Sequence, residues 1–304
     1  MRYVCERSAM IALLLAAVSA CGGASRGTEP EYTAFGAPER VTVQGYTSDV
    51  MEPFVTRDGR YLLFNDAGPT DKNLFVARYD QANDSFVFMG ALDAVNTPAV
   101  DGVPTVDTAY NIYYVSTFHY PPNGNAVFDT IYRGRFDPGA PGFVTGATIV
   151  PDLSEGILGR VNFDVEVSPD GETLYFVDGV FSGGSWPDEA DFAYAVDGGS
   201  GFVRAPDSDR IFAAINTDRL EYAACISADG LEFFFTRLDP SAGDIGIYRA
   251  TRTRPDQPFG PPARVSAITG FAEAPALSPD EKTLYYHRKD PSTGRFELWR
   301  VRRP

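Results

Sequence analysis

Short apolar runs, each only a few residues long, follow one another from about residue 50 to the end of the chain. They are rich in Tyr, Phe, Val and Ile, and clusters of Gly, Pro, Asp and Ser separate them. Aromatic and β-branched runs of this kind favour β-strands, and they lack the spacing of an amphipathic helix. The pattern therefore predicts an all-β fold.

One plan repeats five times: a short apolar strand, a turn with Ser/Thr-x-Asp, an aromatic strand, a variable loop and a third strand. The turns are Thr56-Arg57-Asp58-Gly59, Ser168-Pro169-Asp170-Gly171, Ser227-Ala228-Asp229-Gly230 and Ser278-Pro279-Asp280-Glu281, with Thr105-Val106-Asp107 as a divergent copy. In such turns Pro presets φ, Asp bonds its own backbone and Gly accepts a positive φ. The turn aspartates recur every 49 to 63 residues, a spacing typical of four-stranded sheets joined by loops.

The ends of the repeats predict how the sheets are completed. Third strands are predicted at 74–77, 130–133, 192–194, 245–248 and 297–300, and fourth strands at 86–89, 143–149, 202–212 and 263–268. The last repeat stops after its third strand, at Arg302-Arg303-Pro304. Residues 35–41 match residues 259–265, which lead into a fourth strand. We therefore expect the N-terminal segment to complete the last sheet and close a ring, which removes exposed sheet edges.

The turn Ser168-Pro169-Asp170-Gly171 leading into Leu174-Tyr175-Phe176, with a later Ile247-Tyr248-Arg249, resembles the WD-like repeat of TolB-type β-propellers. The resemblance implies a β-propeller, and the five repeats together with the N-terminal match predict five four-stranded blades, closed by an N-terminal strand that completes the last blade. The expected blades are 35–50 with 272–304, 51–98, 99–150, 160–213 and 220–268. We expect no role in Tol-type envelope complexes, because the separate N-terminal domain that TolB itself carries has no counterpart here.

The first residues predict an exported lipoprotein. Arg2 and Arg7 precede an apolar run, 10–17, that is too short to span a membrane. The run ends at Val18-Ser19-Ala20-Cys21, which resembles the lipobox of bacterial lipoproteins and implies lipidation of Cys21. We expect a signal peptide at 1–20, a flexible tether at 21–34 and the propeller at 35–304. An ordinary secretory signal with a chance cysteine is the alternative.

The lipid anchor would be the only link to a membrane, and the expected location is the cell envelope, at the outer membrane facing the periplasm or the cell surface. The chain has 41 acidic and 26 basic residues, a net charge of -15. Nucleic acid is therefore not an expected partner, because it is a polyanion. We expect a glycan, a peptide or an envelope protein as partner, while the oligomeric state stays open. Cys225, in an apolar run, is expected to be a buried hydrophobe.

Two long loops between second and third strands carry aromatic side chains among Gly, Pro and Asn. One contains His119 and Tyr120, and the other contains Phe181 and Trp186. In a propeller these loops lie on the same face as the residues that open the first strands. Exposed rings on a rigid scaffold often form binding loops. The alternative is that these rings only cover the edges of their own sheets.

Each first strand also opens with a carboxylate. These residues are Glu52, Asp101, Asp164, Glu221 and Glu273. If they converged they would repel one another, so some would stay protonated, pair with Arg160 or Arg219, or bind a cation such as Ca²⁺. Separate, solvated acids are the alternative. No cofactor is otherwise predicted.

We prefer a noncatalytic binding or scaffold module that uses this face. The alternative is an enzyme similar to the five-bladed glycoside hydrolases, in which a pair of acids flanks the scissile bond, here Asp164 with Glu221 or Glu273. A structural lipoprotein that docks to an outer-membrane assembly is a third possibility. His119 and His287 are the only histidines, and no nucleophile elbow, phosphate loop or dinucleotide motif accompanies them.

Overall fold

The computed structural model describes residues 30–68, 70–121, 127–183 and 186–304. The predicted signal peptide, Cys21 and most of the predicted tether lie outside the described residues. The described part consists of β-strands and a single short helix, α1 (Ser208–Ile211). The predicted all-β fold is therefore confirmed. Within the described ranges, no helix has the length and apolar character needed to cross a membrane.

The strands of the described residues form four hydrogen-bonded sheets. One contains β3 (Val43–Gln44), β7 (Ser85–Ala91), β6 (Leu74–Asp80), β5 (Tyr61–Asn65) and β4 (Met51–Val55). A second contains β11 (Val144–Ile149), β10 (Ile131–Phe136), β9 (Asn111–Ser116) and β8 (Asp101–Val106). A third contains β2 (Glu39–Arg40), β22 (Phe296–Arg302), β21 (Thr283–Lys289) and β20 (Ala272–Leu277).

The fourth sheet joins two sets of antiparallel strands. One set is β12 (Arg160–Val167), β13 (Thr173–Val180), β14 (Glu189–Asp197) and β15 (Phe202–Arg204). The other is β16 (Leu220–Ile226), β17 (Glu232–Asp239), β18 (Asp244–Thr251) and β19 (Ala263–Val265), with β1 (Glu31–Tyr32) beside β19. A single parallel pairing of Ala190 with Leu220 connects the two sets.

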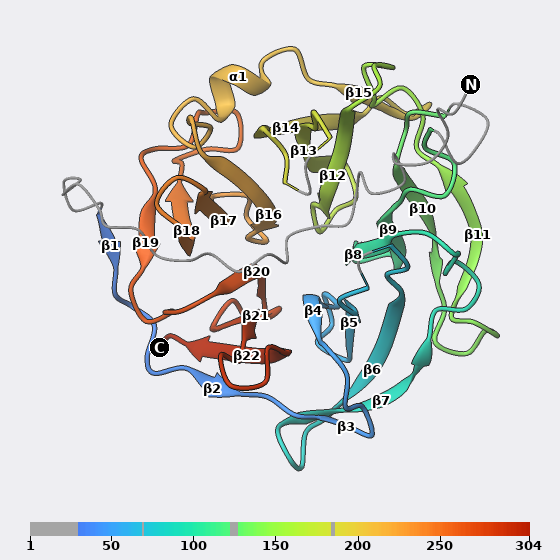
Figure 1. Cartoon of the computed structure of the whole chain (residues 1–304), viewed down its shortest axis with the longest axis vertical. Helices are drawn as coiled ribbons and strands as arrows, with labels where there is room; N and C mark the ends of the chain where they lie inside the picture. The colour runs from blue at the N-terminus through green and yellow to red at the C-terminus, as the bar shows by residue number, and fades with distance from the viewer. Residues whose placement is uncertain (1–29, 69, 122–126, 184–185) are drawn as a thin grey trace, which may run out of the picture.

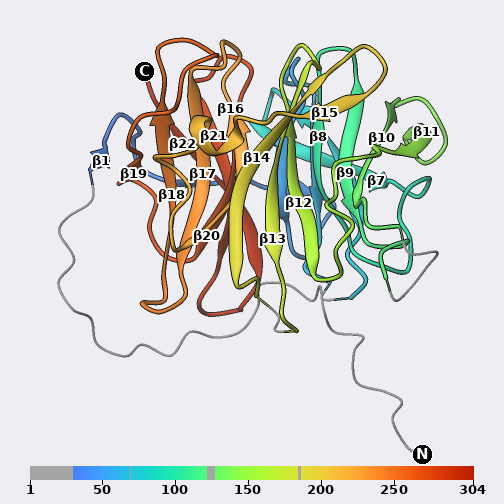
Figure 2. The same ribbon diagram turned by 90° about the horizontal axis from the view of Figure 1, so that it is seen from above.

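The sheets are arranged radially around a common centre (Figure 1), and their strands run roughly parallel to the view axis of that figure, as the turned view shows (Figure 2). The innermost strands are β4, β8, β12, β16 and β20. Each of them contacts the next, and β20 contacts β4. Side chains from all five strands therefore meet at the centre of the molecule. We call these five the inner strands.

The turn chemistry expected from the repeats is present. The hydroxyl of Ser168 donates to the carboxylate of Asp170, which also accepts from the backbone N–H of Glu172. The same pair of bonds recurs at Asp58, Asp229 and Asp280. In the divergent copy Asp107 instead accepts from the backbone and side chain of Asn111. Each turn thus fixes the start of the aromatic strand through side-chain bonds to the backbone.

Some predicted strands are shorter than expected, and the fourth strand predicted at 263–268 ends at Val265. The fourth strand predicted at 202–212 ends at Arg204, because the chain stops pairing with β14 at Pro206 and then forms α1. Within residues 35–41, which are predicted to complete the last sheet, only Glu39–Arg40 is a strand. Gly36 also donates a backbone hydrogen bond to Arg302. This strand pairs with β22, where Glu39 lies opposite Arg300 and Arg40 opposite Trp299.

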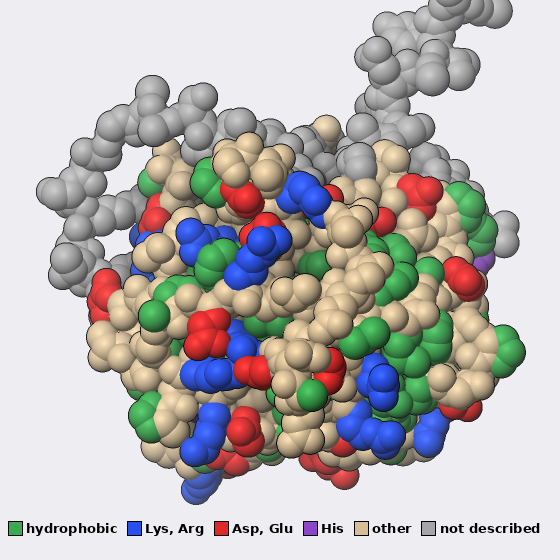
Figure 3. Space-filling view, turned by 90° about the horizontal axis from the view of Figure 1, so that it is seen from below, with side chains coloured by type: hydrophobic (Ala, Val, Ile, Leu, Met, Phe, Trp, Pro, Cys, Tyr) green, Lys and Arg blue, Asp and Glu red, His purple; other side chains and the backbone are tan. Residues whose placement is uncertain are grey.

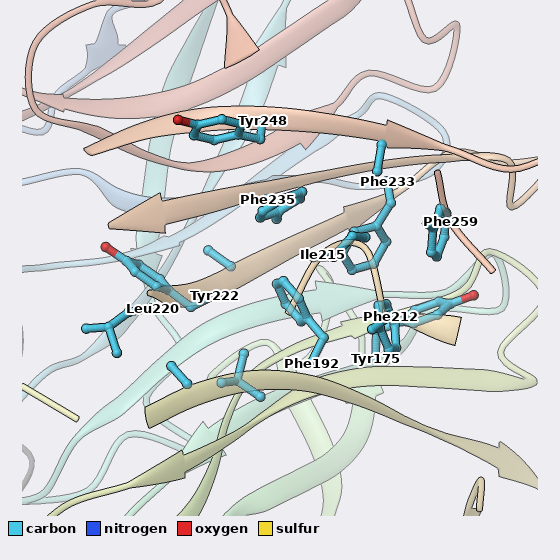
Figure 4. Close-up of a cluster of buried hydrophobic side chains, with 14 of the residues drawn as sticks. Tyr175, Phe192, Phe212, Ile215, Leu220, Tyr222, Phe233, Phe235, Tyr248 and Phe259 are labelled. Atoms are coloured by element: carbon cyan, nitrogen blue, oxygen red, sulfur yellow. The ribbon is translucent and has the colours of Figure 1, made fainter. Parts of the chain in front are cut away.

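Aromatic side chains fill the space between neighbouring sheets. In the cluster of Figure 4, Phe192 of β14 meets Phe233 of β17 edge to face, with ring centroids 5.0 Å apart. Phe212, next to α1, stacks on Phe259 at 5.8 Å. Such ring pairs stabilise by about 1 kcal/mol beyond the burial of their area. Cys225 is buried among apolar side chains, as predicted.

The outer surface mixes charges of both signs. Figure 3 shows Lys and Arg side chains beside Asp and Glu on the face seen from below in Figure 1. Arg300 of β22 binds Asp84 at 2.6 Å and Glu39 at 2.9 Å, and Arg302 also binds Asp84. Arg300 is buried, so its fork fixes β2 and the turn before β7 against the C-terminal strand.

Candidate functional site

Every inner strand contains the same irregularity near its first third. The pairing register shifts between Met51 and Phe54 in β4, and equivalent shifts occur in β8, β12, β16 and β20. The first residue inside each bulge has a positive φ although it is not glycine. These residues are Glu52 (49°), Val103 (53°), Asp164 (51°), Ala223 (55°) and Ala274 (54°). Such a conformation is unfavourable for side-chain-bearing residues and concentrates at functional sites.

The bulge separates the five predicted acids into three positions. Glu52 and Asp164 occupy the bulge itself, whereas Glu273 lies one residue before it. Asp101 and Glu221 lie two residues before it. Because a bulge interrupts the regular alternation of side chains, acids at different distances from it point in different directions, and the five do not form one ring. The expectation of five converging acids is wrong, and the structure brings together only Glu52, Asp164 and Glu273.

These three carboxylates belong to a buried group that we call the axial cluster: Glu52, Lys72, Asp164, Tyr222, Glu273 and His287. The ammonium of Lys72 binds both oxygens of Glu52, at 3.1 and 3.2 Å. The hydroxyl of Tyr222 donates to Oε1 of Glu273. Nε2 of His287 lies 3.0 Å from Oε2 of Glu273.

The hydrogen bonds of His287 fix its tautomer. Its Nδ1 accepts the backbone N–H of Glu52 at 3.0 Å, so a neutral ring carries its proton on Nε2. That proton points to Glu273, and the histidine thereby links β21 to both β4 and β20. Neither this link nor the Lys72 ion pair was predicted. The register of Glu273 opposite His287 across β20 and β21 is the signal that could have revealed the histidine.

Asp164 has a different environment from its two neighbours. Burial, followed by the charges of Glu52 and Glu273, raises the pKa of Asp164 well above its ordinary value, while Lys72 opposes the shift. Its Oδ2 accepts one backbone bond, from Ala223 at 3.1 Å. This shift favours the protonated form of Asp164, which can donate a hydrogen bond, whereas an ionised carboxylate cannot.

Asp101 and Glu221 bind elsewhere. Asp101 accepts from the backbone and hydroxyl of Thr97, and burial raises the pKa of Asp101 to about 6. Glu221 accepts from Thr217 and forms an ion pair with Arg237 at 2.7 Å.

Pairing with Arg160 or Arg219 is one of the outcomes expected if the acids converge. Arg160 binds Glu155 at 3.1 Å, and Arg219 binds Asp239 at 3.5 Å. Two of the predicted acids bind other cations. Glu52 binds Lys72, which lies just before β6, and Glu221 binds Arg237 of β17.

The predicted aromatic residues mostly pack inside the protein. Tyr120 is 3% and Phe181 7% exposed, and both pack against Val161. Their rings cover a sheet edge and do not face solvent, contrary to the expectation of exposed binding loops. Trp186 is partly buried against the cluster of Figure 4, and Nδ1 of His119 lies 2.7 Å from the hydroxyl of Tyr132. Phe118, at 42% exposed, is the ring in this loop that solvent reaches.

Among the described residues, no group of three or more His, Cys, Asp or Glu side chains has an arrangement that could hold a metal ion. A small pocket of about 20 Å³ is lined by Glu52, Val103, Ala223 and Ala274, together with neighbouring residues of the inner strands. Glu52 is the member of the axial cluster that lines this pocket, and the other lining residues come from the bulges and the residues that follow them. Chemically, this arrangement offers one carboxyl group with a raised pKa, next to two acidic side chains whose oxygens already bind protein groups.

No family model matches the sequence, and no curated protein matches it. Solved structures are similar in fold. The catalytic domain of a GH62 α-L-arabinofuranosidase from Coprinopsis cinerea has a TM-score of 0.58 at 14% identity, over 90% of this chain and 98% of that chain. A family 117 glycoside hydrolase from Zobellia galactanivorans has a TM-score of 0.58 at 11% identity, over 88% and 90%.

TolB from Acinetobacter baumannii has a TM-score of 0.48 at 14% identity, over 84% of this chain. The chain spans about half the length of that TolB structure, 54%. At these identities a likeness shows the fold alone. The glycoside hydrolase structures, which are propeller folds, support the β-propeller fold for this chain.

Proposed function

We propose that the propeller has five four-stranded blades and is closed by the pairing of β2 with β22. Three observations support this number. The inner strands contact one another in a closed series, the same bulge occurs in each, and the turn motif has five copies. We further propose that Cys21 anchors the propeller to the cell envelope through lipid, as the lipobox-like sequence indicates.

The function that the geometry supports best is noncatalytic binding of a glycan or peptide at the axial cluster. One observation carries this proposal: every carboxylate oxygen of Glu52 and Glu273 has a protein partner, in Lys72, Tyr222 and His287. A glycosidase needs two carboxylates that reach the scissile bond, whereas these two are held inside the protein. Asp164 remains as a donor that fits a hydroxyl or carbonyl oxygen of a ligand.

The test uses residues 27–304 and panels of oligosaccharides and peptides, first by thermal shift and then by calorimetric titration. Asp164→Asn keeps the size of the side chain but replaces its acid proton. For a ligand that binds the wild type, we expect at least tenfold weaker binding, the effect of about 1.4 kcal/mol. Asp244→Asn makes the same change at an exposed ion pair and should bind as the wild type does. Equal affinity of the wild type and the Asp164 variant would exclude the axial cluster as the binding site.

A glycoside hydrolase is the second candidate. The observation that favours it is the raised pKa of Asp164 beside Glu52 and Glu273, because a carboxyl group that keeps its proton to a higher pH can act as a general acid. Aryl glycosides, α-L-arabinofuranosides included, are the assay substrates that the similar folds suggest. Turnover that is lost in Asp164→Asn and Glu273→Gln but retained in Asp244→Asn would establish this function and overturn the noncatalytic one.

A further inference from the structure

A second cavity, of about 340 Å³, lies outside the axial cluster. The segment that follows β15 lines it, together with the first residues of β12, the last residues of β13 and residues of β14. The side chains that matter for its chemistry are Asn162, Asp178, Glu189, Asp191, Arg204 and Asp209. None of these residues belongs to the predicted sites.

Asn162 has a free acceptor in this cavity. The residue is 4% exposed, and its amide group donates to Asp178 at 2.6 Å. Its Oδ1 is buried and has no hydrogen-bond partner. Buried polar atoms in proteins almost always have a partner, so an orphaned acceptor beside a cavity indicates a group that donates to it.

The charges around the cavity favour a cation. Two arginines line it, and each already has an anionic partner: Arg204 binds Asp178, and Arg160 binds Glu155 at 3.1 Å. Glu189, Asp191 and Asp209 form no ion pair with the described residues. After these pairings, the cavity therefore retains three carboxylates and no cation to balance them.

Asp191 is the carboxylate most strained by this surplus. Burial, and then the charges of Glu221 and Glu189, raise the pKa of Asp191 to about 6. A ligand with a positive charge would relieve the repulsion, and it would bind the ionised form of Asp191 in preference to the protonated form.

We propose that this cavity binds a small ligand through an ammonium group, whose N–H bonds reach Oδ1 of Asn162 and whose charge is balanced by Asp191 and Glu189. An organic cation fits better than a metal ion, because the described carboxylates do not converge in a metal-binding arrangement. The ammonium can come from a diamine, an amino sugar or a lysine side chain, since all three present the same group. The inference does not depend on the axial cluster.

The test titrates residues 27–304 with 1,4-diaminobutane, glucosamine and a lysine-containing tripeptide at pH 7.5, followed by calorimetry and thermal shift. N-acetylglucosamine is the matched neutral ligand, and CaCl₂ is the metal probe. We expect at least one amine to bind, and N-acetylglucosamine to bind at least tenfold more weakly than glucosamine if the amino sugar is that amine. Binding of Ca²⁺ with no amine binding, or no binding of any amine at 10 mM, would overturn the proposal.

Asp191→Asn is the informative variant. It removes a half-buried carboxylate without an ion-pair partner, so it should fold, and we expect it to bind the amine at least tenfold more weakly. Asp244→Asn and Asp164→Asn should leave amine binding unchanged, and the latter separates this site from the axial cluster. Unchanged affinity in Asp191→Asn would contradict the assignment.

Affinity should also depend on pH. The groups around Asp191 are Asp178, Glu189, Asp209, Glu221 and Arg204. The pKa of Asp191 is raised to about 6, so amine binding should weaken as the pH falls below about 6. The Asp191→Asn variant should lose this dependence between pH 5 and 7. The same pH dependence in the wild type and the variant would assign the titration to another group and contradict the role of Asp191.

Discussion

Burial and neighbouring charge decide what each acidic residue of this protein can do. Glu221 and Glu52 are buried but ion-paired, with Arg237 and Lys72. Asp101 is fully buried and has hydroxyl and backbone donors instead of a cation. A carboxyl group in that environment keeps its proton to a higher pH than it does in the unfolded chain.

Asp101 should therefore leave a signature in the pH dependence of stability. Its pKa is raised from 3.8 to about 6 in the folded state, so between these values the folded chain holds a proton that the unfolded chain has lost. The stabilisation from this group is complete at low pH and is lost as the pH rises through about 6. It contributes a slope of about −1.4 kcal/mol per pH unit to the free energy of unfolding in that window.

In Asp101→Asn the slope of the unfolding free energy between pH 4 and 6 should be less negative by about that amount. Urea unfolding at several pH values measures it, with Asp244→Asn as the control that should keep the wild-type slope. Parallel pH profiles for Asp101→Asn and the wild type would show that Asp101 titrates at its ordinary value.

At the scale of the element, the repeated turn and the repeated bulge differ in how far the sequence reveals them. The turns could be predicted, because Ser, Asp and Gly each supply a local hydrogen bond or backbone conformation that depends only on near neighbours. The bulges could not, because Glu52, Val103 and Ala223 share no chemistry that indicates a positive φ. The five acids lie either in a bulge or one or two residues before it, and a bulge interrupts the alternation of side chains, so they do not form a ring although all five lie on the inner strands.

The fourth strand at 202–212 failed for a related reason. The pattern places the apolar residues Phe202, Ile211 and Phe212 in one strand. In the structure, Ile211 belongs to α1 and Phe212 follows it, and both pack into the core. Short apolar runs do not distinguish a strand from a helical turn. The repeat predicts the three carboxylates of the axial cluster on the inner strands. It does not predict Lys72 and His287, because their positions depend on contacts between strands far apart in the chain.

The turns allow a matched test of the backbone. Gly59 and Gly171 occupy the same position of two turns, with φ of 73° and 79°. A methyl group on Gly59 would meet Pro279 at 3.6 Å, an ordinary contact, whereas one on Gly171 would lie 2.6 Å from the carboxylate of Asp107. Gly59→Ala should lower the free energy of unfolding by about 1 kcal/mol through its backbone conformation alone.

Gly171→Ala should lower it further, because Asp107 must move away from Asn111, to which it is bonded. Chemical unfolding of the two variants measures the difference. Equal losses of unfolding free energy in the two variants would mean that Asp107 can move away from Asn111 at no cost in stability.

For the whole molecule, the two ends of the described chain are held together. β2 pairs with β22, and Arg300 and Arg302 bind Glu39. Removing β2 would expose the backbone edge of β22 and leave the buried Arg300 with fewer partners. Exposed edges of this kind pair with other chains.

A chain that begins at Val43 should therefore melt at a lower temperature than one that begins at residue 34, which keeps β2 but not β1. It should also self-associate. Thermal unfolding and light scattering measure the two effects, and the chain that begins at residue 34 is the control. If both chains melt alike and stay monodisperse, the pairing of β2 with β22 contributes little to stability.

The bulge of the inner strands has a consequence for how this fold changes over time. Because the backbone path at the bulge is the same whether the residue is Glu52, Asp164, Val103, Ala223 or Ala274, the geometry tolerates acidic, branched and small side chains alike. The functional groups at the centre can then be exchanged one inner strand at a time, without rebuilding the sheets. Ala223 and Ala274, which line the small pocket beside Glu52, are the places where evolution or an engineer could introduce a new functional group.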